Sequence, residues 1–270
     1  MRPIVAVITD FGGRDHYAGA LKGAVLAACP EASVVDLSHE IPRHDVGEAS
    51  WTLLAAYRAF PAGAVFLVAV ETEAAGDRPG LAVEAGGYRF AAPDNGALGL
   101  VIGEHPDARV HAITNRGLFR HEVSATFRGR DVLAPVAGRL ASGAPLEEVG
   151  PAVGEAKGSR LPEPRELGGG CWEAEVVHVD RFGNLTTSFS RRDLEAILAG
   201  VGGDMTEVVA VVGEVVLPFV NSYSEISEGE LCALLGSSGR VEVAVARGDA
   251  AETLSAGRGT RVRLRPASVA

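Results

Sequence analysis

Lysine is nearly absent from this sequence: only Lys22 and Lys157 occur, and the remaining basic residues are arginines scattered along the chain. The 270 residues carry a formal net charge of −10 at pH 7. A nucleic-acid-binding surface needs a concentrated positive patch, because contacts with phosphates provide much of its affinity. We therefore expect no nucleic-acid partner.

Long hydrophobic runs are also missing. Crossing a bilayer takes roughly 20 consecutive apolar residues, and no stretch of this chain approaches that length. Residues 4–8 are apolar and follow Arg2, as at the start of a signal peptide, but Asp10, Arg14 and Asp15 interrupt the run before it reaches signal length. We expect a cytoplasmic protein with no membrane partner.

Cysteine is scarce, and its three occurrences are far apart in the sequence, at Cys29, Cys171 and Cys232. This spacing is neither that of a zinc site nor that of a disulfide-rich secreted domain. It indicates buried thiols in a reducing compartment.

Several cofactor motifs are absent. The chain has no Gly-x-x-x-x-Gly-Lys-Ser/Thr loop, no Gly-x-Gly-x-x-Gly after its first apolar run and no His-Glu-x-x-His sequence. Nucleoside triphosphates, nicotinamide cofactors and zinc peptidase chemistry are therefore unsupported. The histidines are scattered, and we expect His39, His44 and His121 to make ordinary polar contacts rather than to bind metal. The prediction is an enzyme without a metal or cofactor.

The first half of the chain alternates short β-branched runs with longer helical patterns, which is typical of a parallel sheet between helices. The pattern predicts an α/β N-terminal domain with a mainly parallel sheet. Strands are expected at residues 4–8, 33–37, 65–70, 81–84, 88–91 and 109–113, and helices at residues 17–29, 46–60 and 131–142.

The composition changes between residues 150 and 170, where Pro, Gly, Glu and Arg dominate and apolar periodicity is weak. We therefore predict two domains, 1–160 and 161–270. The second part has short β patterns at the spacing of a small barrel or sandwich, so we expect a smaller all-β, barrel-like C-terminal domain. Its predicted strands are residues 172–179, 207–212, 229–235, 241–246 and 261–264.

Acidic residues follow the first three predicted strands: Asp10, Asp36 and Glu71. Ligands of doubly wound sheets bind outside the carboxyl ends of the strands, although Asp at these points is also a favoured helix N-cap. For Asp36 we prefer the N-cap interpretation. For Asp10 we prefer a binding role, because the Gly12-Gly13 pair lets a ligand approach the backbone.

Two further polar segments precede or interrupt predicted elements. The first, residues 126–131, places a hydroxyl and two cations before a predicted helix, whose N-terminus favours anions; a surface pair of Arg130 with an N-capping Asp131 explains it equally well. The second, residues 180–187, suits a purine, because the ring could stack on Phe182 while Asn184 offers a donor and an acceptor. A hairpin turn would explain only part of this second segment.

Taken together and in order, these segments resemble the S-adenosylmethionine (SAM) hydroxide adenosyltransferases, the SAM hydrolases related to the SAM-dependent fluorinase and chlorinase. The resemblance covers nearly the whole chain. It rests on Thr9-Asp10-Phe11-Gly12 with Asp15 and Tyr17, Lys22-Gly23, Val35-Asp36-Leu37-Ser38-His39-Glu40-Ile41, Phe60-Pro61-Ala62-Gly63, Pro93-Asp94-Asn95-Gly96, Thr126-Phe127-Arg128-Gly129-Arg130-Asp131, Phe182-Gly183-Asn184, Asn221-Ser222-Tyr223-Ser224-Glu225 and Gly236-Ser237-Ser238.

The resemblance implies a homotrimer that holds SAM between the N-terminal domain of one subunit and the C-terminal domain of the next. By position, Asp10 would bind the ribose hydroxyls. The C5′ side would be lined by Thr126, Phe127 and Gly129. Adenine and methionine would be held by Asp180, Phe182, Asn184, Tyr223 and Ser237. The remaining substrate-binding residues implied by the resemblance are Asp15, Ser238, Glu242 and Arg247.

The sequence departs from the family pattern at the residues that carry the chemistry. SAM hydrolases displace methionine from C5′ by water or hydroxide, and their water activation is assigned to an Asp-Arg-His set. Here Glu71 replaces the Asp and its Asp-Pro-Gly loop is lost, Arg78 is retained, and Arg128 replaces the His. The resemblance implies that Glu71, Arg78 and Arg128 form the catalytic set, but a guanidinium stays protonated and cannot act as a base.

Three functions fit these substitutions. In an altered hydrolase, Glu71 would orient water while the two arginines stabilise hydroxide. In a chlorinase they would hold chloride, but halogenases carry Tyr in place of Glu71, and a carboxylate beside the nucleophile would repel a halide. In a SAM- or adenosine-binding protein with little catalysis, the binding residues alone would remain. We favour hydrolysis.

Overall fold

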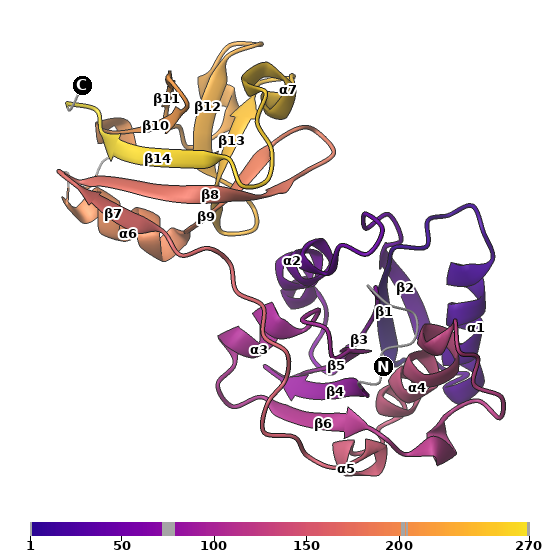
Figure 1. Ribbon diagram of the computed structural model, residues 1–270. Coiled ribbons are helices and arrows are strands. Elements are labelled where there is room, and N and C mark those ends of the chain that lie inside the picture. The colour runs from indigo at the N-terminus through magenta and orange to yellow at the C-terminus, as the bar shows by residue number, and fades with distance from the viewer. Residues whose placement is uncertain (1, 72–78, 201–202, 204, 269–270) are drawn as a thin grey trace. The chain divides into compact units, whose positions relative to one another are not determined.

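The computed structural model describes residues 2–71, 79–200, 203 and 205–268. The chain forms two compact units, Met1–Arg160 and Leu161–Ala270 (Figure 1). Between the last helix of the first unit and the first strand of the second runs a segment with no helix, rich in Gly and Pro. Each unit has its own hydrophobic core.

The first unit is built on a six-stranded sheet with the order β2-β1-β3-β5-β4-β6. Strand β1 is parallel to β2 and β3, and β3 is parallel to β5. Strand β4 is antiparallel to both of its neighbours, so the sheet is mixed. The strands are β1 (Ile4–Thr9), β2 (Ser33–Ser38), β3 (Val65–Ala69), β4 (Gly80–Ala85), β5 (Tyr88–Pro93) and β6 (Arg109–Ile113).

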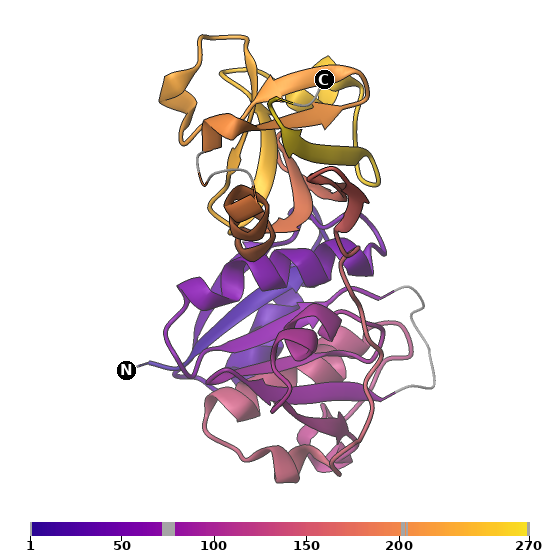
Figure 2. The same cartoon turned by 90° about the vertical axis from the view of Figure 1, so that its left-hand side faces the viewer.

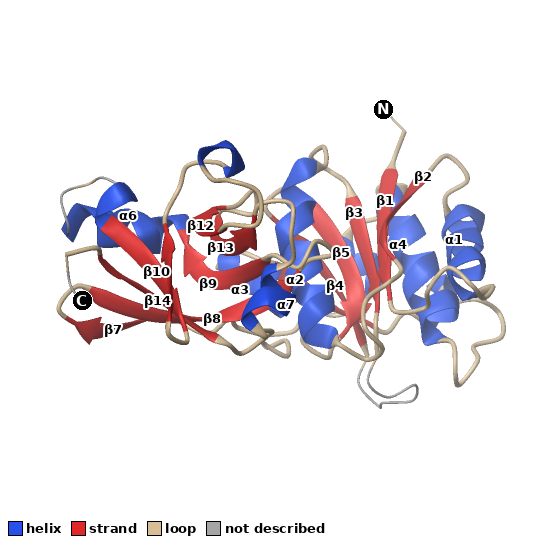
Figure 3. Ribbon diagram, turned by 90° about the horizontal axis from the view of Figure 1, so that it is seen from above, coloured by secondary structure: helices blue, strands red, loops and turns tan. Residues whose placement is uncertain are grey.

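Helices cover both faces of this sheet. Helices α2 and α3 lie on one face, and α1 and α4 lie on the other (Figures 2 and 3). Leucine, valine and alanine of α1 and α4 form one core with apolar side chains of β1, β3 and β5. The helices are α1 (Tyr17–Ala28), α2 (Val46–Ala56), α3 (Gly99–Glu104), α4 (Ala134–Ala141) and α5 (Leu146–Val149), with 3-10 turns at Tyr57–Ala59 and Arg116–Leu118.

The second unit is an antiparallel barrel that is nearly closed. Its strand order is β11-β10-β14-β8-β9-β13-β12, and β7 pairs with β8 outside this path. A bridge between Phe219 and Ala233 joins the segment after β11 to β12, which brings the two ends of the path together. The strands are β7 (Arg165–Gly168), β8 (Cys171–Val179), β9 (Leu185–Ser190), β10 (Val208–Val212), β11 (Val215–Pro218), β12 (Leu231–Leu235), β13 (Arg240–Val245) and β14 (Arg261–Pro266).

Two helices accompany the barrel, α6 (Arg191–Gly200) and α7 (Ala250–Leu254), with 3-10 turns at Met205–Glu207 and Tyr223–Glu225. The apolar face of α6 contributes Leu194, Ile197 and Leu198 to the barrel core. An α-helix places side chains three and four positions apart on one face, which is why these three meet the strands together.

The predicted fold class is confirmed: an α/β unit is followed by a smaller barrel of β-strands. The sequence patterns missed the strands β7, β9 and β11, and they missed helices α3, α5, α6 and α7. They also placed the start of the helix at 131–142 incorrectly, because residues Gly129–Leu133 form a π-helical turn before α4 begins. In the described part of the chain, no helix is both long and apolar enough to span a bilayer.

Candidate functional site

A cavity of about 340 Å³ opens at the carboxyl ends of β1 and β3 in the first unit. Parallel strands bring their carboxyl ends to one edge of a sheet, and the loops that follow supply the polar groups. Seven residues expected from the sequence line it: Asp10, Asp15, Glu71, Thr126, Phe127, Arg128 and Gly129. Arg78 lies outside the described residues.

The turn after β1 is held in a defined geometry. The buried Thr9 hydroxyl lies 2.8 Å from Nδ1 of His39 and accepts a hydrogen bond from the backbone N–H of Phe11. Gly12 adopts a φ of +67°, and its N–H donates to the His39 carbonyl at 2.7 Å. A residue with a Cβ is disfavoured at this φ, so glycine lets the chain turn and leaves Asp10 at the cavity wall.

Asp36 does not cap a helix, contrary to the sequence-based interpretation. It lies within β2, and its carboxylate contacts Lys22 Nζ at 3.0 Å and His39 Nε2 at 3.1 Å. Burial opposes its charge, but the contacts with Lys22 and His39 hold the pKa of the Asp36 carboxyl below its usual value. The N-cap of α2 is instead Asp45, which accepts from the Glu48 N–H.

His44 is a cavity residue that the sequence interpretation missed. It lies between β2 and α2 with a φ of +63°. Its backbone N–H donates to the Asp10 carboxylate at 2.9 Å, and its Nδ1 lies 2.6 Å from the carbonyl oxygen of Glu71. His44 therefore joins two of the acidic residues at the strand ends, and it lines the same cavity with Arg43.

The segment that carries Glu71 is fixed from a second side. The Asn95 side-chain amide donates to the Val70 carbonyl at 2.9 Å. Asn95 also accepts from the Ala97 N–H, and the neighbouring Asp94 accepts from the Lys157 N–H. The turn at residues 93–96, which was only weakly informative in the sequence, positions the end of β3.

The carboxyl group of Glu71 has a raised pKa in this cavity. Burial raises its pKa, the positive charge of Arg128 lowers it, and the negative charge of Asp10 raises it again, with a net increase. A carboxylate with a raised pKa binds a proton more readily than a solvated one. Glu71 is thus a perturbed group in a cavity, and perturbed groups in clefts are often functional.

Asp131 anchors the loop that carries Arg128. Its side chain is fully buried and accepts hydrogen bonds from Arg130 at 2.6 and 2.8 Å and from the Ser124 N–H at 2.8 Å. Arg120 contacts it at 3.3 Å, and the Arg120 N–H donates to the Asp131 carbonyl. The alternative of a surface Arg130–Asp131 pair with an N-cap is therefore wrong: the pair exists, but Asp131 is buried and holds the preceding loop.

Aromatic rings close one side of the cavity. The centroids of Phe11 and Phe127 are 5.6 Å apart, and those of Tyr17 and Phe127 are 5.3 Å apart, both in edge-on geometry. The guanidinium of Arg130 lies 4.8 Å from the Phe127 centroid. Edge-to-face pairs and cation–π contacts favour a defined ring orientation, so the Phe127 ring, next to Arg128 in the sequence, is held by packing.

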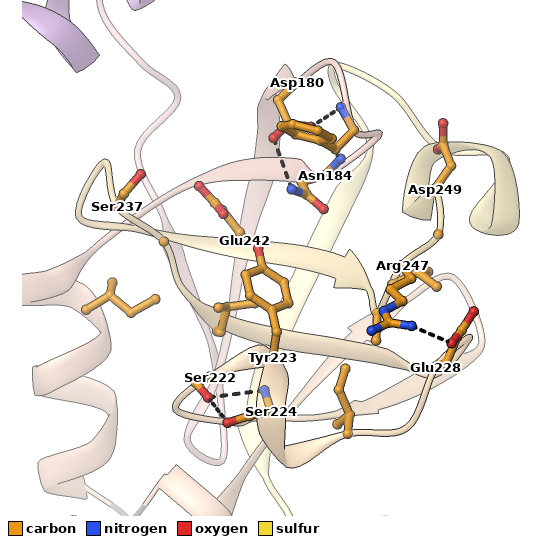
Figure 4. Close-up of a pocket in the computed structure, with 18 of the residues that line it drawn as sticks. Asp180, Asn184, Ser222, Tyr223, Ser224, Glu228, Ser237, Glu242, Arg247 and Asp249 are labelled. Atoms are coloured by element: carbon orange, nitrogen blue, oxygen red, sulfur yellow. Dashed lines mark hydrogen bonds and ion pairs between the residues drawn. The ribbon is translucent and has the colours of Figure 1, made fainter.

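The second unit contains a larger open pocket of about 1480 Å³ (Figure 4). It lies at the turn between β8 and β9, the loop before β12 and the ends of β12 and β13. The residues expected from the sequence that line it are Asp180, Phe182, Asn184, Tyr223, Ser237, Glu242 and Arg247.

The β8–β9 turn is organised by Asp180. One of its carboxylate oxygens accepts from the N–H groups of Phe182 and Asn184 at 2.8 and 2.9 Å, and the other accepts from the Asn184 amide at 3.0 Å. Phe182 is 73% exposed, which leaves a ring face open to a ligand. Gly183 has a φ of +79°, and a Cβ there would lie 2.1 Å from the Asp249 carboxyl group.

Glu242 and Tyr223 line this pocket together with Asp180 (Figure 4). Burial raises the pKa of the Glu242 carboxyl, Asp180 raises it further, and the Thr186 hydroxyl opposes this. Burial also raises the pKa of Tyr223, as does the charge of Glu242. A Cβ at Gly236 would lie 2.1 Å from Glu242, so the glycine makes room for this carboxyl group.

Two residues that the sequence predicted to bind the substrate, Arg247 and Ser238, differ in their surroundings from the other predicted binding residues. Arg247 lines the pocket but forms an ion pair with Glu228 at 3.1 Å (Figure 4). Ser238 is not among the lining residues; its buried hydroxyl has no hydrogen-bond partner within the described part of the chain. The pocket also contains Glu228 and Asp249, which sequence reasoning missed because they belong to no recognisable motif.

Possible metal ligands are dispersed in both units. Within residues 2–71, 79–200, 203 and 205–268, no three His, Cys, Asp or Glu side chains are grouped closely enough to hold an ion.

Comparisons with known proteins connect the two units to one family. The N-terminal domain of the SAM hydroxide adenosyltransferases matches residues 5–150, and their C-terminal domain matches residues 174–263. The chain is 35% identical over 265 residues to a protein of Salinispora tropica named (R)-S-adenosyl-L-methionine hydrolase, with 97% of each chain covered. It is 36% identical to a Thermus thermophilus protein of the same name, covering 98% of this chain and 100% of the relative.

More distant sequences and a solved structure agree with this assignment. Proteins named fluorinase match at 27–32% identity. A crystal structure of an uncharacterized conserved protein from Thermotoga maritima superposes with a TM-score of 0.90 at 32% identity, covering 97% of this chain and 99% of the other. The chain belongs to the SAM hydroxide adenosyltransferase family.

Proposed function

We propose that this protein is a SAM hydrolase that displaces L-methionine from C5′ of SAM by water and releases adenosine. The observation that carries the proposal is the placement of Glu71 and Arg128 with Asp10 around one cavity at the strand ends. Relatives of nearly full length that are 34–36% identical are named for this activity.

The two pockets offer groups that match different parts of SAM. Asp10 would accept hydrogen bonds from the ribose hydroxyls, since a carboxylate has about four lone-pair positions and the His44 N–H uses one of them. The exposed ring of Phe182 would stack on adenine, and Asn184 would read the edge of the base. Asp180 and Glu242 line the same pocket and would face the methionine ammonium group.

Water activation would be shared between Glu71 and Arg128. The sulfonium is a good leaving group, so catalysis consists mainly of placing a desolvated nucleophile in line with the C5′–S bond. A carboxylate at Glu71 would accept a hydrogen bond from the water and orient it. The Arg128 charge, which acts on Glu71, would stabilise the developing hydroxide. Arg78 remains a candidate for the same role.

The charge of the cavity argues against a halide nucleophile. Asp10, Asp15 and Glu71 contribute three carboxyl groups, whereas Arg43 and Arg128 contribute two guanidinium groups. Chloride would have to enter among these carboxylates, whereas neutral water is not repelled. A protein that only binds SAM is the other alternative, because the binding groups do not depend on Glu71 or Arg128.

Incubation of the purified protein with SAM, with and without chloride, separates the three functions. Chromatography should show adenosine in equal yield with and without chloride. A chloride-dependent 5′-chloro-5′-deoxyadenosine peak would establish halogenation instead. Calorimetric SAM binding without any product would leave only a binding function.

Variants of Arg128 test its role directly. If its charge stabilises the nucleophile, Arg128→Ala should lower kcat at least ~10-fold while SAM affinity changes much less. Arg128→His restores the residue typical of the family and should raise hydrolysis if the site is only weakened. An unchanged kcat in Arg128→Ala would remove Arg128 from the mechanism.

We further propose, from the family resemblance, that the protein is a cytoplasmic homotrimer in which neighbouring subunits share each substrate. Light scattering coupled to size-exclusion chromatography tests the assembly. A monomer that hydrolyses SAM would contradict it.

A further inference from the structure

The hydrolysis proposed above releases a proton, and the guanidinium of Arg128, which lines the cavity, cannot accept it. When water attacks C5′, an O–C5′ bond forms, the C5′–S bond breaks and its electron pair returns to sulfur as the thioether of methionine. The attacking water then carries one proton too many. An imidazole is the side chain best suited to take up such a proton near neutral pH.

We propose that His44 is the catalytic base that accepts this proton on Nε2. The proposal rests on the proposed hydrolase function and adds a residue to it. His44 lines the cavity that contains Glu71 and Arg128, although it lies in a different loop, between β2 and α2. No motif in the sequence distinguished it from the other histidines.

Hydrogen bonding fixes which ring nitrogen can act. The Nδ1 atom lies 2.6 Å from the Glu71 carbonyl oxygen, and a carbonyl oxygen only accepts hydrogen bonds. Nδ1 must therefore carry the proton, which leaves Nε2 of the neutral ring as an acceptor. Within the described part of the chain, Nε2 has no hydrogen-bond partner. The same contact ties the ring to the residue that would orient the water.

The backbone of His44 shows that this position is specifically held. Its φ of +63° lies in the left-handed region, which a residue with a Cβ rarely adopts. The conformation is maintained by the N–H bond to Asp10 at 2.9 Å, by the Nδ1 contact and by the N-cap of α2 at the next residue, Asp45. Unfavourable backbone conformations persist where the surrounding structure imposes them, and they concentrate at functional sites.

Other charged groups around the ring are consistent with this role. The titratable residues that line the same cavity are Asp10, Asp15, Tyr17, Arg43, Glu71 and Arg128. The cavity therefore contains both carboxylates and guanidinium groups, and Asp10 also accepts the backbone N–H of His44 at 2.9 Å. In this scheme Glu71 orients the nucleophile by a hydrogen bond while the proton passes to His44.

Three variants test the base. His44→Asn keeps a donor near the Nδ1 position and tolerates a left-handed φ, but it lacks Nε2. It should bind SAM within about threefold of the wild type and lose about 100-fold or more in kcat, the usual range for a general base. His44→Gly opens space for added imidazoles. His121→Asn, at an exposed histidine of the same unit, is the matched control and should keep wild-type kcat.

Chemical rescue separates proton transfer from a purely structural role. Adenosine formation by His44→Gly should rise with added imidazole, and among substituted imidazoles of similar size it should increase with their basicity. The proposal would be overturned if added imidazole did not restore adenosine formation, or if the restored rate did not depend on the basicity of the imidazole. It would also be overturned if the kcat of His44→Asn stayed within threefold of that of the wild type. A wild-type protein that makes no adenosine would instead refute the hydrolase function itself.

Discussion

Replacement of Asp131 by asparagine should destabilise the protein strongly and loosen the loop that carries Arg128. Asp131 is fully buried and receives hydrogen bonds from Arg130 and from the Ser124 N–H. Asparagine has nearly the same shape, but its amide group is a donor and would point at other donors. The substitution therefore removes the charge and one acceptor without opening a cavity.

The size of the effect follows from these contacts. A hydrogen bond to a charged group contributes about 1.5–3 kcal/mol, and Asp131 makes two such bonds with Arg130. Part of this loss is recovered because the side chains of Arg130 and Arg120 are 29% and 50% exposed and can be rehydrated. We expect the free energy of unfolding to fall by about 2–4 kcal/mol, which corresponds to a Tm decrease of roughly 4–16 °C for a chain of this size.

Thermal unfolding followed by circular dichroism at pH 7 measures this change. The matched control is Glu148→Gln, because Glu148 faces Arg139 at 3.9 Å and both side chains are nearly half exposed. Such surface pairs contribute about 0–1 kcal/mol, so the control should keep the wild-type Tm within about 3 °C. A loss below about 1 kcal/mol in Asp131→Asn would refute the reasoning.

The effect should also depend on pH. Burial opposes the Asp131 charge, but Arg130, the Ser124 N–H and Arg120 together hold the pKa of Asp131 below its usual value. The stabilisation is therefore complete above the pKa of an unfolded Asp, and it is lost as pH falls through the folded pKa. The difference in Tm between the wild type and Asp131→Asn should therefore become smaller in acid. A difference that stays constant with pH would contradict this explanation.

Two further predictions concern the pockets. Gly183→Ala should destabilise the second unit by about 1–3 kcal/mol, because φ at this position is +79° and the added Cβ would overlap Asp249. SAM binding measured by calorimetry should weaken as well. An unchanged affinity would show that this turn does not contact the ligand. Glu71→Gln should lower kcat yet raise the Tm slightly at neutral pH, because burial raises the pKa of Glu71 and penalises its charge. The increase in Tm should disappear as the pH falls below the pKa of Glu71 in the folded protein. A Glu71→Gln variant with a lower Tm than the wild type at neutral pH would contradict this prediction.

Local sequence patterns were sufficient for most of the first unit. Residues 4–8, 33–37 and 65–70 were recognisable as strands because each is a short β-branched run between turn signals, and β1, β2 and β3 lie there. Because parallel strands end at the same edge of a sheet, the pattern alone predicts that Asp10 and Glu71 converge. Both residues line one cavity in the folded chain.

The antiparallel direction of β4 and the short barrel strands could not be read in the same way. Strands such as β7 and β11 contain four residues each, which is too few for a periodic pattern. Their pairing depends on hydrogen bonds with other strands of the barrel. The π-helical turn at Gly129–Leu133 likewise depends on contacts made by the folded chain.

The sequence by itself determined the two-part α/β and barrel architecture, the family and many of the polar residues that line the two pockets, because these depend on local periodicity and on ordered motifs. Only the tertiary structure decided that Asp131 is a buried anchor, that Asp36 is an ion-pair partner, and that His44 faces the site in a left-handed conformation. Each of these roles depends on burial and on partners from other loops or elements, Ser124, Lys22 and Glu71 respectively. Such partners meet only when the chain is folded.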